Sequence, residues 1–182
     1  FKFFKTKYAG VKTAMHAGEL TLGLVKPEDL KYHINQAVRI ADADRIGHGI
    51  DIAYEENSEE LLLYMSANKI PVEINLSSND FILGVNGNRH PILLYKSYNV
   101  PIVISTDDAG VLRTDLTEQF LILLRDYPSL KYKDVKEAVY NSINYSFLEK
   151  SEKDKIIKRL NSKFDVFESN FKEKSKSTDI TN

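Results

Sequence analysis

Four short, β-like segments recur in the first 105 residues, and each one ends in a cluster of polar side chains. The segments cover residues 11–15, 45–49, 71–76 and 100–105. Stretches with apolar residues at helical spacing separate them, for example Leu30, Ile34, Val38 and Ala41. Short strands alternating with helices predict a parallel sheet with helical crossovers. The chain is therefore predicted to have an α/β fold.

The number of strands limits which α/β fold is possible. A (β/α)₈ barrel of the TIM type takes about 250 residues and eight strands, so about four parallel strands in 182 residues predict half of such a barrel. A half-barrel leaves two open sheet edges and an uncovered apolar face, which favour self-association. A complete, open four-stranded α/β domain is the alternative.

The remainder of the chain has a helical pattern. We expect helices over residues 115–126, 133–144 and 149–170, and one domain over residues 1–170. Residues 171–182 are polar and rich in lysine and serine, so we expect a disordered tail there.

Composition excludes several classes of function. The 25 basic and 26 acidic residues give a net charge of −1, so we expect neither nucleic acid nor membrane as a partner. The absence of cysteine excludes thiolate metal ligands and a cysteine nucleophile within the chain. The first residues lack the pattern of a signal peptide, and we expect a cytoplasmic protein.

Two polar clusters contain a histidine directly after a predicted strand. His16 and Glu19 stand three residues apart, which suits a metal ligand beside an acid, although a solvent-facing turn has the same pattern. His48 lies between two glycines, which allow a close approach by a ligand or an unusual backbone path. A single histidine of this kind is also compatible with a structural role.

A pair of adjacent carboxylates follows the fourth predicted strand. Asp107 and Asp108 repel each other unless a cation or a proton separates them, so the pair indicates a metal or a raised pKa. An aspartate is also a good helix N-cap, and both interpretations hold if one residue caps and the other binds. The serines and Asn79 of residues 77–80 are typical of a turn, and His90 is predicted to begin a helix before Pro91.

The order of these motifs resembles the adenosine deaminase family of the amidohydrolase superfamily. The resemblance rests on His-Ala-Gly-Glu, Arg-Ile-Gly-His-Gly, Val-Glu-Ile-Asn-Leu-Ser-Ser-Asn and Ser-Thr-Asp-Asp, and covers about residues 10–160. It implies a (β/α)₈ barrel of which this chain is the C-terminal half, followed by C-terminal helices. It also implies a zinc-dependent hydrolysis of adenosine, or a related purine nucleoside, to inosine and ammonia.

The resemblance also implies a role for five residues. His16 and Asp107 would bind Zn²⁺, and Glu19 would be a catalytic residue that hydrogen-bonds purine N1 and supplies its proton. His48 would orient or deprotonate the attacking water, and Asp108 would hold purine N7. Such a site uses zinc to lower the pKa of water towards about 7.

Two departures from the family pattern affect these expectations. The family's His-x-His zinc ligands are absent from the 182 residues, so we expect the remaining ligands in an N-terminal half, and no turnover by this chain alone. Ala109 and Gly110 follow the aspartate pair where many members have proline, which is similar to the growth-factor-like and nucleotide-related branches. The alternatives are thus a deaminase of another amino-purine or nucleotide, and a non-catalytic association module.

Overall fold

The computed structural model describes residues 1–178. It divides into two compact units, Phe1–Tyr145 and Ser146–Asn182, whereas the sequence predicted one domain over residues 1–170. The first unit contains the sheet and every candidate site residue, and the second contains the long C-terminal helix. Each unit is described by itself.

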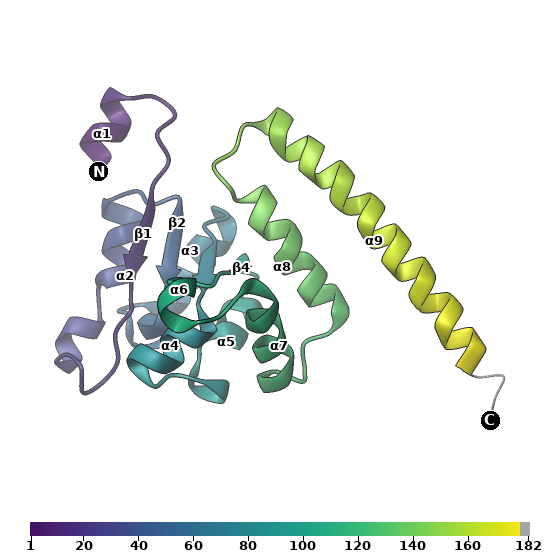
Figure 1. The fold of residues 1–182 in the computed structure, drawn as a ribbon. Coiled ribbons are helices and arrows are strands. Elements are labelled where there is room, and N and C mark those ends of the chain that lie inside the picture. The colour runs from purple at the N-terminus through teal and green to yellow at the C-terminus, as the bar shows by residue number, and fades with distance from the viewer. Residues whose placement is uncertain (179–182) are drawn as a thin grey trace. The chain divides into compact units, whose positions relative to one another are not determined.

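The first unit is built around a parallel sheet of four strands, as predicted. The strands follow one another in the order β1-β2-β3-β4, and every neighbouring pair is parallel. Figure 1 shows β1 and β2 as neighbouring arrows that point in the same direction. Each is shorter than its apolar segment in the sequence: β1 Ala14–Ala17, β2 Arg45–His48, β3 Val72–Ile74 and β4 Ile102–Ile104. The C-terminal end of every strand therefore lies at the same edge of the sheet.

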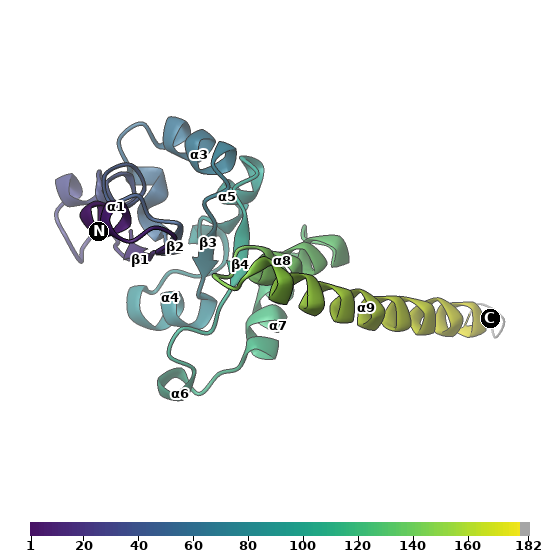
Figure 2. The same cartoon turned by 90° about the horizontal axis from the view of Figure 1, so that it is seen from above.

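Helical segments connect the strands and cover the sheet. Figure 2 shows α3 and α5 on the same side of the row of strands. Fully buried strand residues such as Ile46, Val72 and Ile74 pack with Ile34, Leu61, Met65 and Tyr95 from these connections. Burying each large apolar side chain stabilises the fold by roughly 1.5–3 kcal/mol. The connections comprise η1 Pro27–Leu30, α2 His33–Asn35, η2 Gln36–Ile40, η3 Ile50–Tyr54, α3 Ser58–Ala67, α4 Leu76–Leu83, η4 Gly87–Arg89 and α5 Ile92–Ser97.

The first crossover differs from the single helix that the sequence predicted after Pro27. It breaks into η1, α2 and η2, and η2 is a π-helix in which Ala41 N–H donates to the carbonyl of Gln36. The Glu55 carboxylate accepts hydrogen bonds from the backbone N–H groups of Ile34 and Asn35. A helix can begin again at this point because a distant carboxylate satisfies its free donors.

Further helices precede and follow the sheet in the first unit. These are α1 Lys2–Lys7, α6 Ala109–Leu112, α7 Leu116–Asp126 and α8 Tyr132–Asn144. The bounds of α7 and α8 agree closely with the predicted helices. Asp115 begins α7 as an N-cap, since its carboxylate accepts from the backbone N–H of Glu118 at 2.9 Å.

The second unit consists mainly of α9, Lys150–Thr178. This helix is longer than the predicted 149–170 and continues through residues 171–178, where the sequence suggested disorder. Residues 179–182 of the expected tail lie outside the described residues. Within the described part of the chain, α9 and the other helices are all too short or too polar to cross a membrane.

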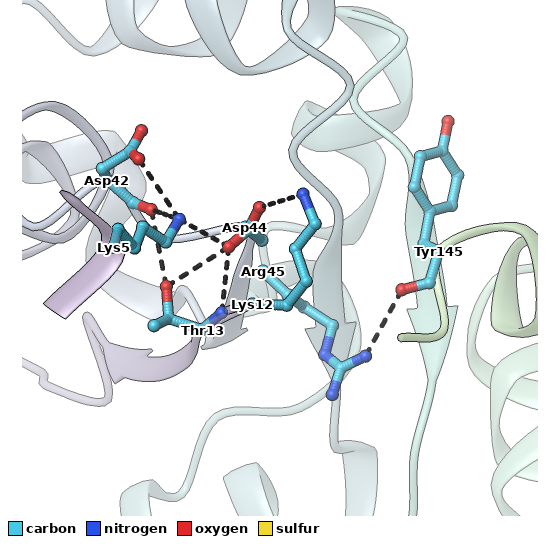
Figure 3. A network of polar contacts seen from close by, with 7 residues as sticks. All are labelled: Lys5, Lys12, Thr13, Asp42, Asp44, Arg45 and Tyr145. Atoms are coloured by element: carbon cyan, nitrogen blue, oxygen red, sulfur yellow. Dashed lines mark hydrogen bonds and ion pairs between the residues drawn. The ribbon is translucent and has the colours of Figure 1, made fainter. Parts of the chain in front are cut away.

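An ion-pair network joins α1 to the beginning of the first two strands (Figure 3). Asp44 accepts from Lys5 Nζ at 2.6 Å, from Lys12 Nζ at 2.8 Å and from the backbone N–H of Thr13 at 2.9 Å. Although burial alone would raise the pKa of Asp44, these donors lower it to about 2. The network fixes the N-terminal edge of the sheet, opposite to the edge that carries the candidate site.

We expect Asp44→Asn to lower the free energy of unfolding by about 1–2 kcal/mol at pH 7. Because the folded-state pKa of Asp44 lies below its ordinary value of 3.8, its stabilisation is complete above pH 4. The stabilisation is lost as the pH falls towards 2, so the difference between Asp44→Asn and wild type should shrink there. Urea unfolding at pH 7 and pH 3, followed by circular dichroism, measures this.

Asp42→Asn is the matched control. Asp42 also contacts Lys5, but its side chain is 65% exposed, so we expect a change below about 0.5 kcal/mol. Equal effects of the two substitutions would show that the buried contacts of Asp44 are not the stabilising ones.

Candidate metal-dependent active site

The C-terminal ends of β1 and β2 bring two predicted site residues together. His16 of β1 pairs in register with Gly47, and Ala17 pairs with His48 of β2. A Cβ atom at Gly47 would lie 3.0 Å from Cδ2 of His16, so the glycine leaves room for the imidazole. The rings of His16 and His48 meet edge to face, with their centroids 4.7 Å apart.

Two carboxylates complete the cluster. Glu19 Oε2 lies 3.7 Å from His16 Nδ1 and 3.5 Å from His48 Nε2. Asp107, in the loop after β4, places its Oδ2 atom 3.7 Å from His48 Nε2. The structure thus brings His16, Glu19, His48 and Asp107 together at one edge of the sheet, while their functional roles stay predictions.

The side chains of the site differ in burial, and burial shifts the pKa values of two of them. His48 is fully buried, and burial, assisted by the nearby His16, lowers the pKa of His48 to about 4 although Asp107 opposes the shift. Burial also raises the pKa of Glu19, with a contribution from Asp107 and against the effect of His16. Both shifts favour the uncharged form of the side chain.

Left-handed backbone conformations set the paths of the loops after β1 and β2. Gly18, His48 and Gly49 have φ angles of 70°, 69° and 60°, in the left-handed region. The Gly18 carbonyl accepts from the backbone N–H groups of Ile50 at 2.8 Å and Asp51 at 3.1 Å, which ties the two loops together. Asp107 also has a positive φ, 54°, which is strained for a residue with a side chain and is frequent at functional sites.

Asp108 is not part of this cluster. Its side chain is exposed, and it makes no hydrogen bond or ion pair with the four clustered residues of the described chain. It is the N-cap residue of α6, but its side chain makes no capping hydrogen bond. The substrate-binding role expected for Asp108 therefore stays a prediction.

Sequence reasoning missed three buried polar residues behind His48. Asn79 Nδ2 lies 2.9 Å from His48 Nδ1, and Asn75 Nδ2 lies 3.3 Å from the same nitrogen. His90 Nε2 contacts Asn79 Oδ1 at 3.1 Å. The segment containing Asn79 was expected to be a turn but forms helix α4, which directs this amide towards the site. A polar residue at a buried position of that helix is the sequence signal that could have revealed the contact between Asn79 and His48.

The donor atoms of the cluster suit a divalent metal. One ligand atom each from His16, Glu19 and His48 lies within 4.8 Å of the others. Imidazole nitrogens and carboxylate oxygens are the donors that Zn²⁺ takes in proteins when cysteine is absent. The residues present therefore fit such an ion, and Asp107 adds a second carboxylate beside them.

A half-barrel sheet with histidines and carboxylates at its C-terminal strand ends has the arrangement of an active site in the class of (β/α)₈-barrel enzymes. The sequence model of the adenosine deaminase family matches residues 2–163. The chain belongs to the adenosine deaminase family, as its motifs suggested.

Named relatives agree with this family. An adenosine deaminase from Clostridium kluyveri is 32% identical over 160 residues, which cover 87% of this chain and 42% of the relative. A human N6-methyl-AMP deaminase is 31% identical over 159 residues, covering 86% and 42%. The chain therefore spans less than half the length of these curated relatives.

Comparison with solved structures confirms the fold class. An amidohydrolase from Burkholderia ambifaria, solved with bound zinc, superimposes with a TM-score of 0.71 at 21% sequence identity. The match covers 89% of this chain and 43% of that structure. The four strands thus correspond to half of a TIM-type barrel, followed by helices.

We expect Gly49→Ala to disrupt the loop that carries His48. A Cβ atom there would lie 2.4 Å from the Tyr95 hydroxyl, which donates to the Gly49 carbonyl at 2.6 Å, and φ is already positive. The substitution should lower the free energy of unfolding by about 2–4 kcal/mol, measured by urea unfolding.

Gly84→Ala provides the comparison, because Gly84 has a similar φ of 63° but no atom within 4 Å of the added methyl group. Backbone strain alone should cost about 1–2 kcal/mol there. If Gly49→Ala were no worse than Gly84→Ala, the contact with Tyr95 would not constrain the loop.

Proposed function

We propose that this chain forms the C-terminal half of a zinc-dependent deaminase that hydrolyses adenosine to inosine and ammonia. The observation that carries the proposal is the convergence of His16, Glu19, His48 and Asp107, in which His48 Nε2 lies within 3.7 Å of both carboxylates. Membership of the adenosine deaminase family supports the choice of a purine as substrate.

In this proposal His16 and Asp107 hold the metal. His16 suits this role because its side chain is 67% exposed and offers a neutral nitrogen, while Asp107 offers a hard oxygen ligand. When bound, Zn²⁺ supplies a nucleophile at neutral pH by lowering the pKa of water towards about 7. A catalytic zinc retains three protein ligands, so the remaining ligands are assigned to the N-terminal half of the barrel.

Glu19 is proposed as the general acid. Burial raises the pKa of Glu19, which favours the protonated carboxyl that this role needs. As hydroxide forms a bond to purine C6, the Glu19 proton passes to N1 and neutralises the charge that develops there. The hydroxyl proton on C6 then passes to the amino group, the C6–N6 bond breaks as the C6 carbonyl forms, and ammonia leaves. The proton lost when water became hydroxide restores the acid form of Glu19.

His48 and Asp108 are proposed to position the reactants. His48 lies beside both carboxylates and either orients the attacking water or removes its proton. Asp108 is proposed to hold purine N7 from the exposed loop that begins α6. Neither assignment involves a nucleic acid or a membrane, and we propose a cytoplasmic location.

A second candidate substrate is an amino-purine nucleotide. The human relative named N6-methyl-AMP deaminase is almost as similar to this chain as the clostridial adenosine deaminase, at 31% against 32% identity. Ala109 and Gly110 after the aspartate pair also favour the nucleotide-related branch of the family. The reaction is again hydrolysis at purine C6, with ammonia leaving from AMP and methylamine from N6-methyl-AMP, and the contacts to the phosphate and to the N6 substituent would differ.

We expect the active protein, with both barrel halves present, to decrease the absorbance of adenosine as inosine forms. Glu19→Gln should lower kcat by at least about 100-fold, because an amide cannot transfer a proton to N1. Initial rates with adenosine, adenine, AMP and N6-methyl-AMP identify the preferred substrate.

Glu28→Gln serves as the control, since Glu28 is exposed on η1 and should leave kcat unchanged. Full activity of Glu19→Gln would remove Glu19 from the mechanism. Inactivity towards every amino-purine tested would contradict the proposed function and favour an association module.

The sheet order supports the need for a second barrel half. β1 and β4 stand at the two ends of the described sheet, whereas a closed barrel pairs every strand on both sides. We propose that these edges associate with the complementary half, or with a second copy when that half is absent.

The 182-residue chain alone is therefore expected to show no turnover and less than one equivalent of zinc. The active protein should contain stoichiometric zinc, which His16→Ala should remove and His33→Ala should not. Elemental analysis and the adenosine assay measure both properties. Turnover by the isolated chain would show that its own residues complete the site.

A further inference from the structure

A backbone amide sets the proton position on His90. The N–H group of Ile92 donates to His90 Nδ1 at 3.3 Å. Since a backbone amide can only donate, Nδ1 must be unprotonated, and a neutral His90 ring carries its proton on Nε2. Burial lowers the pKa of His90 to about 4, which agrees with a neutral ring.

The proton on His90 then fixes the orientation of the Asn79 side chain. His90 Nε2–H donates to Asn79 Oδ1 at 3.1 Å, so the amide oxygen faces His90 and the amide nitrogen faces His48. Asn79 Nδ2 donates to His48 Nδ1 at 2.9 Å. Asn75 Nδ2 lies 3.3 Å from the same nitrogen and 3.5 Å from His48 Nε2, so this amide does not distinguish the two ring nitrogens.

His48 Nδ1 is therefore an acceptor, and its ring proton must lie on Nε2. A doubly protonated ring would place an N–H against the amide nitrogen of Asn79, so the network requires a neutral His48. On its other side, Nε2 faces Glu19 Oε2 at 3.5 Å and Asp107 Oδ2 at 3.7 Å, which are oxygen acceptors. The contact of Asn79 with Nδ1 and the carboxylates beside Nε2 therefore indicate the same tautomer.

We propose that Asn79 and His90 are positioning residues that hold neutral His48 as its Nε2–H tautomer, so that His48 takes part as a hydrogen-bond donor. The role in catalysis rests on the proposed function, but the tautomer does not. With a proton on Nε2, the imidazole has no lone pair on the side of the site. His48 can therefore orient and stabilise an attacking oxygen, but it can neither deprotonate water nor serve as a metal ligand through Nε2.

The tautomer separates His48 from the residues that could bind a metal ion. His16, Glu19 and His48 are close enough to hold an ion together, but the hydrogen-bond network withdraws His48 from that group. The Nε2–H tautomer also decides between the two roles proposed for His48, orientation and deprotonation, in favour of orientation.

Nuclear magnetic resonance of ¹⁵N-histidine-labelled protein reads the tautomer directly. Long-range ¹H–¹⁵N spectra should show His48 Nε2 in the protonated range and Nδ1 in the unprotonated range, both as purified and after Zn²⁺ is added. The signals are assigned by their loss in His48→Gln and His90→Gln. A proton on Nδ1, or a zinc-induced shift of His48 Nε2, would overturn the proposal.

Asn79→Asp tests the relay at its central residue. A carboxylate has the same shape but only accepts, so His48 should move its proton to Nδ1 and present a lone pair to the site. In the active protein we expect kcat to fall by about 10- to 100-fold, with KM changed less than about twofold. His90→Gln keeps a donor towards Asn79 Oδ1 and should preserve the wild-type tautomer, whereas His90→Leu should allow both tautomers.

Asn141→Asp is the control for a new carboxylate at a partly buried amide. Asn141 Nδ2 donates to the Ile102 carbonyl at 3.0 Å, so the substitution also places a carboxylate against an acceptor, away from His48. It should alter stability but not the His48 tautomer. An unchanged tautomer in folded Asn79→Asp would refute the relay, even if the protein deaminates adenosine. Conversely, a confirmed relay in a protein without deaminase activity would refute only the proposed function.

Discussion

The hydrogen bonds from Ile50 and Asp51 to the Gly18 carbonyl hold the candidate site together. They join the loop after β1, which carries His16 and Glu19, to the loop after β2, which carries His48. Parallel pairing of the two strands would place the loops at the same edge of the sheet without fixing their side chains. Two backbone donors on one carbonyl convert that proximity into a defined distance between the imidazoles and Glu19.

Glycine is required at both sides of this junction for different reasons. A Cβ at Gly18 would lie 2.3 Å from the Asp51 carboxylate and would push the two loops apart. A Cβ at Gly47 would press on the His16 ring. The glycines beside the two histidines thus determine how closely the loops approach, and for this reason their pattern in the sequence indicates a site at these positions.

The sequence predicted those features that depend on local pattern and failed where distant contacts decide. The four strands and helices α7 and α8 were predicted because apolar periodicity is a local signal. The break in the first crossover was missed because the Glu55 carboxylate, 20 residues away, supplies the cap. The helix through Asn79 was missed because residues 77–80 favour turns by themselves, whereas α4 buries Ser78 and Asn79. Four site residues could be predicted from their positions after strands, but the roles of Asn79 and His90 depend on a fold that joins three separate segments.

The two histidines of the site have the same chemistry but opposite surroundings. The side chain of His16 is 67% exposed at the end of an outer strand, whereas His48 is completely buried and accepts a hydrogen bond on Nδ1 from the Asn79 amide. A histidine whose ring nitrogens are not committed to the protein interior is free to offer a lone pair to an ion. A histidine whose inner nitrogen is occupied by an amide donor must offer its proton instead. The side chains that contact each imidazole ring from the protein interior therefore decide whether the histidine is a metal ligand or a hydrogen-bond donor. The residue types that line the site do not reveal this difference.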